Sequence, residues 1–243
     1  TFLKNKMLLI NCDMGEGLDN DESLMPYIDA ANIACGYHAG DTDTIKKTIA
    51  LAQKNKVQIG AHFSYADKEN FGRKEMFLSN EVVYDKVSEQ LLQFSSIAKE
   101  MGEIITHVKP HGALYNQAAK NIELATTIAT AVFDQLPTAV YYGLSGSIML
   151  EAARNQKLAI AHEVFADRAY VNDGSLCPRN ISGSVFTNEK SVEKQLSLLM
   201  QEKKIRAMDG TIIDVAADTI CIHADTPNAL AFAKVIFSIV KNK

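Results

Sequence analysis

The side chains that could do chemistry in this sequence stand mostly just after short apolar runs. In VKPHGALYN, residues 108–116, a lysine and a histidine lie two positions apart at the end of such a run. Pro110 disfavours helical backbone at Lys109, and Gly112 permits a tight turn. An ordinary turn would need only Asn, Asp, Ser or Gly. The spacing therefore predicts an ammonium and an imidazole held at the mouth of a strand.

Other apolar runs end in the same way. The titratable residues that follow them are Asp13, Glu16, His38, Asp41, His62, Asp67, His107, Lys109, His111, Glu163, Asp167, Arg168, His223 and Asp225. In a parallel α/β fold the carboxyl ends of the strands meet at one edge, where sites are found. Charged groups are costly to bury unless they are paired, so these residues predict either a wet mouth or a functional cluster. We favour the functional cluster.

The residues that we predict to be catalytic are Asp13, Glu16, His38, His62, Lys109, His111, Glu163, Asp167, Arg168 and His223. Carboxylate, imidazole and ammonium groups together suit acid–base chemistry at a carbonyl. The sequence has no GxxxxGK[ST] phosphate loop, no GxGxxG after its first apolar run, and neither an HExxH nor a GxSxG motif. A single histidine at a strand end is often only a structural hydrogen-bonding group, so the prediction concerns the cluster first and its members second.

Apolar runs alternate with amphipathic segments, and this alternation predicts the elements that position the cluster. The expected strands are Met7–Asn11, Ala31–Ala34, Val57–Ala61, Ile104–Val108, Ala139–Tyr142, Ala159–Glu163 and Thr219–Ile222. The expected helices are Thr42–Asn55, Glu81–Met101, Ile122–Gln135, Ser147–Gln156, Val192–Lys203 and Pro227–Val240. The strand count of about seven predicts an irregular β/α barrel in preference to an open doubly wound sheet.

Length and composition bound the class of protein. The 243 residues, 47% hydrophobic and 22% charged, predict one domain, residues 1–243, and the net charge of −4 gives no footprint for nucleic acid. No apolar run approaches the roughly 18 residues of a membrane span, so we expect a cytoplasmic protein with no membrane partner. The four cysteines form no CxxC pair, and the three that lie in apolar strand-like runs are expected to be buried thiols. Tyr65–Leu78 and Asp167–Ser184 are the longest irregular segments, typical of active-site loops.

Several blocks of the sequence resemble the LamB/YcsF family. These are NCDMGEG (11–17), ANIACGYHAGD (31–41), IGAH (59–62), FGR (71–73), VKPHGALYN, EVFADRAY and DGSLCPR within 163–179, and DTICIHADTP (218–227). The resemblance implies the A subunit of a bacterial 5-oxoprolinase, which hydrolyses the lactam of 5-oxo-L-proline to L-glutamate with ATP as co-substrate and with the B and C subunits as partners. It also implies an irregular barrel related to polysaccharide deacetylases and to glycoside hydrolase-like barrels.

That reaction suggests roles for the cluster: charge stabilisation by Lys109 and Arg168, base catalysis by Asp13 or Glu163, and proton transfer by His38, His62 or His111. Two alternatives stay open. One is a stand-alone metal-dependent amide hydrolase or deacetylase that works without ATP. The other is a non-catalytic subunit that binds the substrate.

A metal ion is uncertain at this stage. Asp13, His38 and His62 follow three consecutive strands, and one carboxylate with two imidazoles would suit zinc or another transition ion. His38 lies some distance past its strand, however, so hydrogen-bonded histidines without a metal are the expectation.

Overall fold

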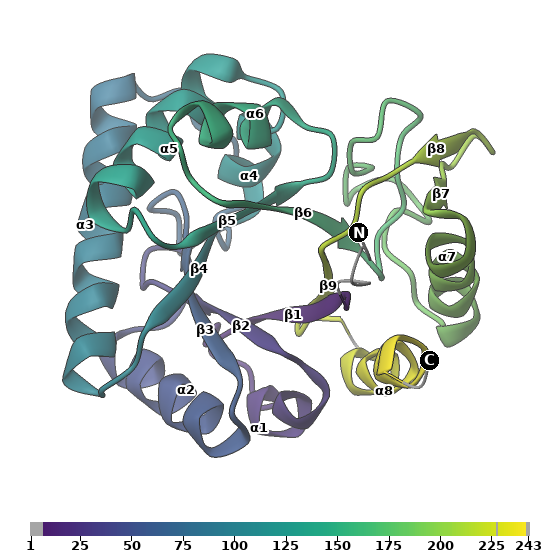
Figure 1. Cartoon of the computed structure of the whole chain (residues 1–243), viewed down its shortest axis with the longest axis horizontal. Coiled ribbons are helices and arrows are strands. Elements are labelled where there is room, and N and C mark those ends of the chain that lie inside the picture. Colours follow the sequence, from purple (N-terminus) through teal and green to yellow (C-terminus); the bar gives the residue numbers. More distant parts are fainter. Residues whose placement is uncertain (1–6, 227, 242–243) are drawn as a thin grey trace, which may run out of the picture.

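Seven parallel strands form a closed barrel in the computed structural model, which describes residues 7–226 and 228–241 (Figure 1). The barrel strands are β1 (Leu9–Met14), β2 (Ala30–Ala34), β3 (Gln58–Phe63), β4 (Ile105–Pro110), β5 (Val140–Leu144), β6 (Ile160–Phe165) and β9 (Thr219–His223). They pair in that order, and β9 closes the barrel against β1. The predicted irregular seven-stranded β/α barrel is confirmed.

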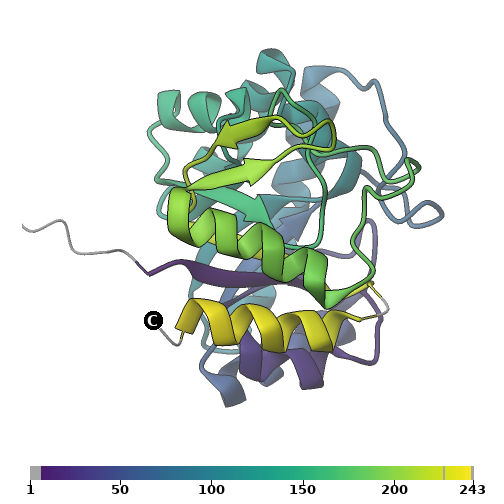
Figure 2. The ribbon, with the colours of Figure 1, turned by 90° about the vertical axis from the view of Figure 1, so that its right-hand side faces the viewer.

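Helices surround the barrel. The longer ones are α2 (Thr42–Asn55), α3 (Asn80–Glu100), α5 (Ile122–Gln135), α6 (Ile148–Asn155), α7 (Glu189–Glu202) and α8 (Ala229–Lys241). Figure 2 shows α7 and α8 side by side along one flank. The predicted helices are all found with boundaries a few residues different, although Pro227, the expected start of the last one, lies outside the described residues. The chain starts α2 and α3 with side-chain caps, because Asp41 accepts from the Thr44 amide and Ser79 from the Val82 amide.

Short elements were missed by the sequence analysis. They are α1 (Asp21–Leu24), the 3-10 helix η1 (Met25–Tyr27), α4 (Gly112–Ala118), and an antiparallel hairpin of β7 (Lys204–Arg206) and β8 (Ile212–Asp214). Each is too short to display a hydrophobic period of its own. The one that matters for the site is α4, because it begins directly after His111 and fixes the end of β4.

The barrel interior contains two stacked polar layers. The neutral layer consists of Asn11, Asn32, His107 and Thr219, and the charged layer, nearer the carboxyl ends of the strands, consists of Asp13, His62, Lys109, Glu163 and Cys221. Strand residues two apart share a face, which explains why Asn11 and Asp13, or His107 and Lys109, occupy successive layers. Gly60 makes room for the first of these layers, since a Cβ there would lie 2.3 Å from the His107 ring.

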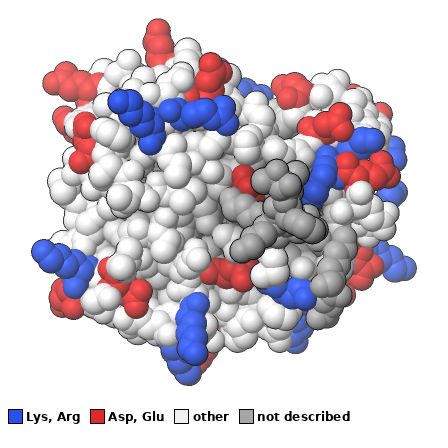
Figure 3. Space-filling view, in the orientation of Figure 1, with Lys and Arg blue, Asp and Glu red and all other residues white. Residues whose placement is uncertain are grey.

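The hydrophobic core lies between the barrel and the helices. The four cysteines are free and buried, which confirms the expectation for the three in apolar runs. Acidic and basic side chains are interspersed around the edge of the face in Figure 3, with an uncharged area between them, so this face has no patch of a single sign. Among the described residues, no helix combines the length and the apolar character needed to cross a membrane.

Candidate active site

A cavity of about 390 Å³ opens at the carboxyl ends of the barrel strands. The predicted site residues that line it are Asp13, His62, Lys109, His111, Arg168 and His223. The remaining predicted residues, Glu16, His38, Glu163 and Asp167, are buried behind the wall, and each contacts a lining residue. The structure therefore brings the whole predicted cluster together around one cavity.

Lys109 is the centre of the charged layer. Its ammonium lies 2.8 Å from Asp13 Oδ1, 3.0 Å from Glu163 Oε1 and 3.1 Å from Cys221 Sγ, and the side chain is only 2% exposed. Burial alone would lower the pKa of Lys109, but Asp13, with Cys221 and Glu163, raises it well above its ordinary value. The ammonium is therefore charged at neutral pH and is shared between two buried carboxylates.

Asp13 joins Lys109 to the histidines. Its Oδ1 accepts from Lys109 Nζ and from Asn32 Nδ2 at 2.7 Å, while its Oδ2 lies 3.3 Å from His62 Nε2. Burial opposes ionisation of this carboxyl, but the contacts with His62 and Lys109 hold its pKa well below the usual range. Asp13 is consequently an ionised acceptor that orients its neighbours.

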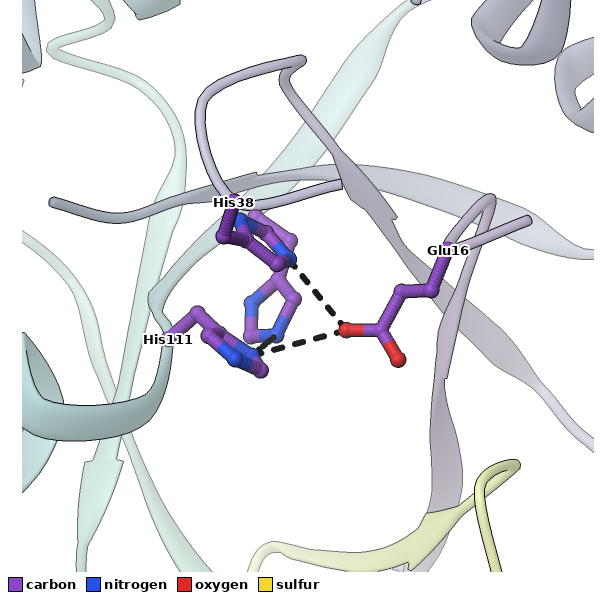
Figure 4. A group of neighbouring side chains, drawn as sticks. Glu16, His38 and His111 are labelled. Carbon is purple, nitrogen blue, oxygen red and sulfur yellow. Dashed lines mark hydrogen bonds and ion pairs between the residues drawn. The ribbon is translucent and has the colours of Figure 1, made fainter. Parts of the chain in front are cut away.

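Glu16 and three histidines form a compact cluster beside Asp13. His38 and His111 stack with ring centroids 3.9 Å apart, and both point towards Glu16 (Figure 4). Glu16 Oε1 lies 3.2 Å from His38 Nε2 and 3.5 Å from His111 Nδ1, and His111 Nδ1 lies 2.9 Å from His62 Nε2. Burial raises the pKa of Glu16 and lowers those of His38 and His111, with Asp13 adding to the rise at Glu16.

The loop between β3 and α3 holds this cluster in place. The Phe71 carbonyl accepts from His111 Nε2 at 2.9 Å, and the Gly72 carbonyl accepts from the Ala113 amide at 2.9 Å. Gly72 has φ +66°, and a Cβ there would lie 2.3 Å from Ser64 Oγ and 3.0 Å from the His111 ring. Only glycine fits this approach, so the predicted active-site role of the segment has a structural basis.

His223 and Asp167 form a second pair beside Asp13. Asp167 Oδ1 lies 2.9 Å from His223 Nδ1, Oδ2 accepts from the His223 amide at 3.2 Å, and the His223 ring stacks on Phe165. Asp167 is fully buried, whereas His223 lines the cavity. Asp167 thus acts through His223 and lies outside the cavity wall.

Arg168 shapes the loop that follows β6. Its guanidinium donates to the carbonyls of Cys177, at 2.5 Å, and Ser184, at 3.3 Å, so part of its hydrogen-bonding capacity is used within the loop. Burial, with the charge of Arg179, lowers the pKa of Arg168 to about 10, and the side chain stays charged at neutral pH. It still lines the cavity, together with the loop residue Cys177.

Several residues of the site were missed by the sequence analysis. Tyr115 donates to Glu163 Oε2 at 2.8 Å, Cys221 contacts Lys109, and Arg73 and Arg179 both pair with Asp225 at the cavity mouth. All lie within the sequence blocks that carry the family resemblance. Their position in those blocks was the available signal.

Other titratable residues that follow the predicted strands lie outside the site. Asp41 caps α2, and Asp67 accepts hydrogen bonds from Asn70 and from the Lys74 amide within its own loop. His107 belongs to the neutral layer, where its ring stacks on Tyr142. For these residues the structural alternative is the correct one.

Among the described residues, two groups have donor atoms close enough to hold a metal ion. One is Glu16, His38, His62 and His111, and the other is Asp13, Cys221 and His223. The set considered from sequence, Asp13, His38 and His62, is divided between them, because His38 projects towards Glu16. In the second group the Lys109 ammonium already contacts Asp13 and Cys221, which leaves the first as the better candidate.

The chain is similar to proteins of known family. The model of the LamB/YcsF family matches residues 8–243. A 5-oxoprolinase A subunit from Geobacillus thermodenitrificans (strain NG80-2) is 41% identical over 242 residues, covering 98% of this chain and 94% of that protein. The crystal structure of a lactam utilization protein from Thermus thermophilus has 36% identity and a TM-score of 0.90, covering 97% of this chain and 96% of that one. A family 4 carbohydrate esterase from Streptomyces lividans, at 11% identity and a TM-score of 0.49, is too distant to support an inference.

Proposed function

The chain belongs to the LamB/YcsF family, and from this premise we propose that it is the component of an ATP-dependent 5-oxoprolinase that opens the lactam of 5-oxo-L-proline to L-glutamate. The observation that carries the proposal is the similarity to a 5-oxoprolinase A subunit over nearly the full length of both chains. We propose further that it works as a single barrel domain in the cytoplasm, together with the B and C subunits, with ATP as a co-substrate of the complex.

The chemistry of the reaction suits the cavity. A five-membered lactam is a resonance-stabilised amide, so its hydrolysis needs an activated carbonyl, a base for the attacking water and a proton for the leaving nitrogen. ATP would activate the lactam oxygen by phosphorylation. The lining of the cavity offers buried imidazoles, an ionised carboxylate and cationic side chains.

The contacts support a division of roles. Lys109 is paired with two carboxylates, so it fixes the charged layer and presents one cationic edge to the cavity. Glu163 is fully buried beneath Lys109, which makes it a positioning residue and leaves Asp13 as the carboxylate beside the cavity. Because the pKa of Asp13 is held low, the carboxylate is a weak base, and its contact with the His62 imidazole makes it an orienting group.

Cationic side chains at the cavity mouth suit an anionic substrate. Arg73, Lys120, Arg168 and Arg179 line the cavity, and the acidic groups near them are Glu75 and Asp225. A guanidinium binds carboxylate and phosphate oxygens in a bidentate manner. We propose that this rim receives the carboxylate of 5-oxoproline and the phosphate introduced by ATP.

Omission experiments test the proposal. The chain is assayed alone, with B and C subunits, and with each of them left out, while glutamate and ADP are measured from the same samples. We expect glutamate only when all the subunits are present together with ATP. Glutamate from the chain alone without ATP would overturn the proposal in favour of a stand-alone hydrolase, and an unchanged rate without the chain would overturn it altogether.

A matched pair of variants separates catalysis from binding. His62→Asn removes an imidazole of the cavity and is expected to lower kcat in the complex by about 100-fold or more. His162→Asn makes the same change at a half-buried residue of β6 that does not line the cavity, and its kcat should match the wild type. If His62→Asn instead weakens substrate binding and keeps normal turnover, the chain only binds the substrate, and the catalytic proposal fails.

A further inference from the structure

The hydrogen bonds of two cavity histidines leave their facing nitrogen atoms without protons. His62 Nδ1 lies 2.9 Å from the Lys109 carbonyl, and His111 Nε2 lies 2.9 Å from the Phe71 carbonyl. A carbonyl oxygen can only accept, so both of these ring nitrogens carry hydrogen. In the neutral rings the other nitrogens, His62 Nε2 and His111 Nδ1, are then bare.

Those two bare nitrogens face each other at 2.9 Å. Two lone pairs at this separation repel, and the side chains nearest to them are two carboxyl groups. Asp13 Oδ2 lies 3.3 Å from His62 Nε2, and Glu16 Oε1 lies 3.5 Å from His111 Nδ1. Lys109 does not relieve this repulsion, because its ammonium is bound to the other oxygen of Asp13. The cluster therefore needs either a proton on one of the two rings or a cation at its centre.

From this geometry we infer that Glu16, His38, His62 and His111 form a binding site for a divalent transition-metal ion, zinc being the reference case. Their donor atoms all lie within 4.8 Å of one another. Ligands at about 2.0–2.2 Å from a tetrahedral ion are about 3.3–3.6 Å apart, and the donor separations of 2.9, 3.2 and 3.5 Å are close to that range. Three imidazoles with one carboxylate are ligands that such ions accept.

The outer contacts of the cluster fit the same inference. A metal-bound histidine usually donates its second N–H to a carbonyl or a carboxylate, and His62 and His111 both do so. The alternative is a proton shared between the two rings. Nitrogen-15 spectra distinguish such a proton from a bound ion.

The position of the site gives the ion a chemical use. His62 and His111 line the cavity, whereas Glu16 and His38 lie behind them, so the ion would have protein on one side and the cavity on the other. An ion so placed can lower the pKa of a bound water molecule or polarise a carbonyl oxygen. The inference depends only on the donor geometry and is independent of the proposed reaction.

Metal content and affinity test the site directly. The full chain, without a histidine tag, is stripped with chelator and titrated with Zn²⁺ and with Co²⁺, and bound metal is counted by mass spectrometry. We expect about one ion per chain and a Co²⁺ absorption spectrum typical of nitrogen and oxygen ligands. In His111→Asn and Glu16→Gln the affinity should fall by at least about tenfold, while His162→Asn should bind as the wild type does.

Each result decides the inference. Absence of stoichiometric binding in the wild type, or unchanged affinity in both ligand variants, would overturn it. Because the wild-type spectrum needs no variant, the test stands even where a substitution prevents folding. Nitrogen-15 spectra of the histidines add a check, since a proton found between His62 and His111 in the presence of excess Zn²⁺ would also overturn the site. A chain that binds the ion and yet makes no glutamate with its partners would instead contradict the proposed function alone.

Discussion

In the neutral layer of the barrel, each donor meets one acceptor, whereas the charged layer above it holds groups whose requirements are not met within the layer. Asn11 Nδ2 donates to Thr219 Oγ1 at 2.7 Å, and Thr219 Oγ1 donates to the Leu9 carbonyl at 3.1 Å. Asn32 donates to Asn11 Oδ1 at 2.7 Å. In the layer above, two carboxylates share one ammonium, and two bare imidazole nitrogens face each other.

Asn32 connects the two layers and fixes the state of His107. Its amide nitrogen must face Asp13, because an ionised carboxylate only accepts. Its Oδ1 therefore faces His107 Nε2 at 2.9 Å, so this nitrogen carries the hydrogen. The Thr106 hydroxyl lies 2.9 Å from the remaining nitrogen, Nδ1, and its one hydrogen is shared between this nitrogen and the Ile59 carbonyl at 3.1 Å. The neutral ring is thus fully satisfied, in contrast to His62 and His111.

Two buried histidines in the same barrel therefore have different roles because their hydrogen-bonding partners differ. His107 and His62 both lie in the barrel interior, and both are at most 1% exposed. One has a complementary partner at each nitrogen, and the other has a nitrogen that faces electron pairs. A buried polar group with complete hydrogen bonding contributes to a unique fold, and an incompletely satisfied one indicates a site for a ligand.

The largest effect is expected from Lys109→Met, which breaks the charged layer. The change leaves Asp13 and Glu163 buried without a counter-charge, and loss of one partner from a buried ion pair costs about 3–5 kcal/mol. Urea unfolding should show this loss in the free energy of unfolding, and glutamate formation by the complex should fall to background.

A double variant shows whether the loss comes from charge. Lys109→Met combined with Glu163→Gln removes one of the uncompensated carboxylates while Tyr115 can still donate to the amide oxygen. We expect it to recover part of the stability and none of the activity. A stable and active Lys109→Met protein would show that the two layers do not differ in the way described.

An intermediate effect is expected from His107→Leu, which breaks the neutral layer. Asn32 Oδ1 loses its donor and the Thr106 hydroxyl loses an acceptor, at a cost of about 2 kcal/mol in the free energy of unfolding. The folded protein should keep kcat within about threefold of the wild type, because His107 does not line the cavity. His107→Gln, which can restore a donor to Asn32, should lose less stability. A large loss of kcat without a loss of stability would place His107 in the catalytic machinery.

The cost of His107→Leu should depend on pH. Burial, followed by the charge of Lys109 and contact with His62, lowers the pKa of His107 to about 3, while Asp13 acts in the opposite direction. The unfolded chain, with a pKa of about 6.5, binds the proton between these values and the folded protein does not. This contribution to stability is therefore complete above pH 6.5 and is lost as the pH falls towards 3. Between pH 7 and pH 5 the difference in stability between wild type and variant should shrink by about 2 kcal/mol. A difference that stays constant, or grows, would contradict the neutral state of His107.

The sequence predicted the barrel and the members of the site because both follow from strand periodicity. Apolar runs marked the strands, and polar residues after each run marked the edge where the strands end. That reasoning found Lys109, His62 and Glu163 and placed them around one cavity, as the structure does. It failed for Asp41 and Asp67, which lie further past their strands and whose side chains serve local turns and caps.

Contacts between distant loops could not be predicted from the sequence. The stacking of His38 on His111 depends on where two loops end, and the Phe71 carbonyl reaches His111 only because its loop folds back at Gly72. The metal set considered from sequence included Asp13 for the same reason: strand order indicated its position, but the loop residue Glu16 is the carboxylate that faces His38 and His111. Strand register follows from the local sequence pattern, whereas loop conformation depends on contacts with the rest of the folded chain.

The smallest effect is expected from Thr106→Val, at the edge of the neutral layer. The valine has nearly the same shape, so the change removes only a hydroxyl that contacts His107 Nδ1 at 2.9 Å and the Ile59 carbonyl at 3.1 Å. Loss of one such hydrogen bond costs about 1 kcal/mol, with no change in kcat. Thr127→Val is the matched control, because this half-buried threonine donates to a carbonyl within α5, far from either layer, and should change stability by less than about 0.5 kcal/mol. Equal unfolding midpoints for the two variants would mean that His107 does not need its second partner, and the account of the neutral layer as fully satisfied would be wrong.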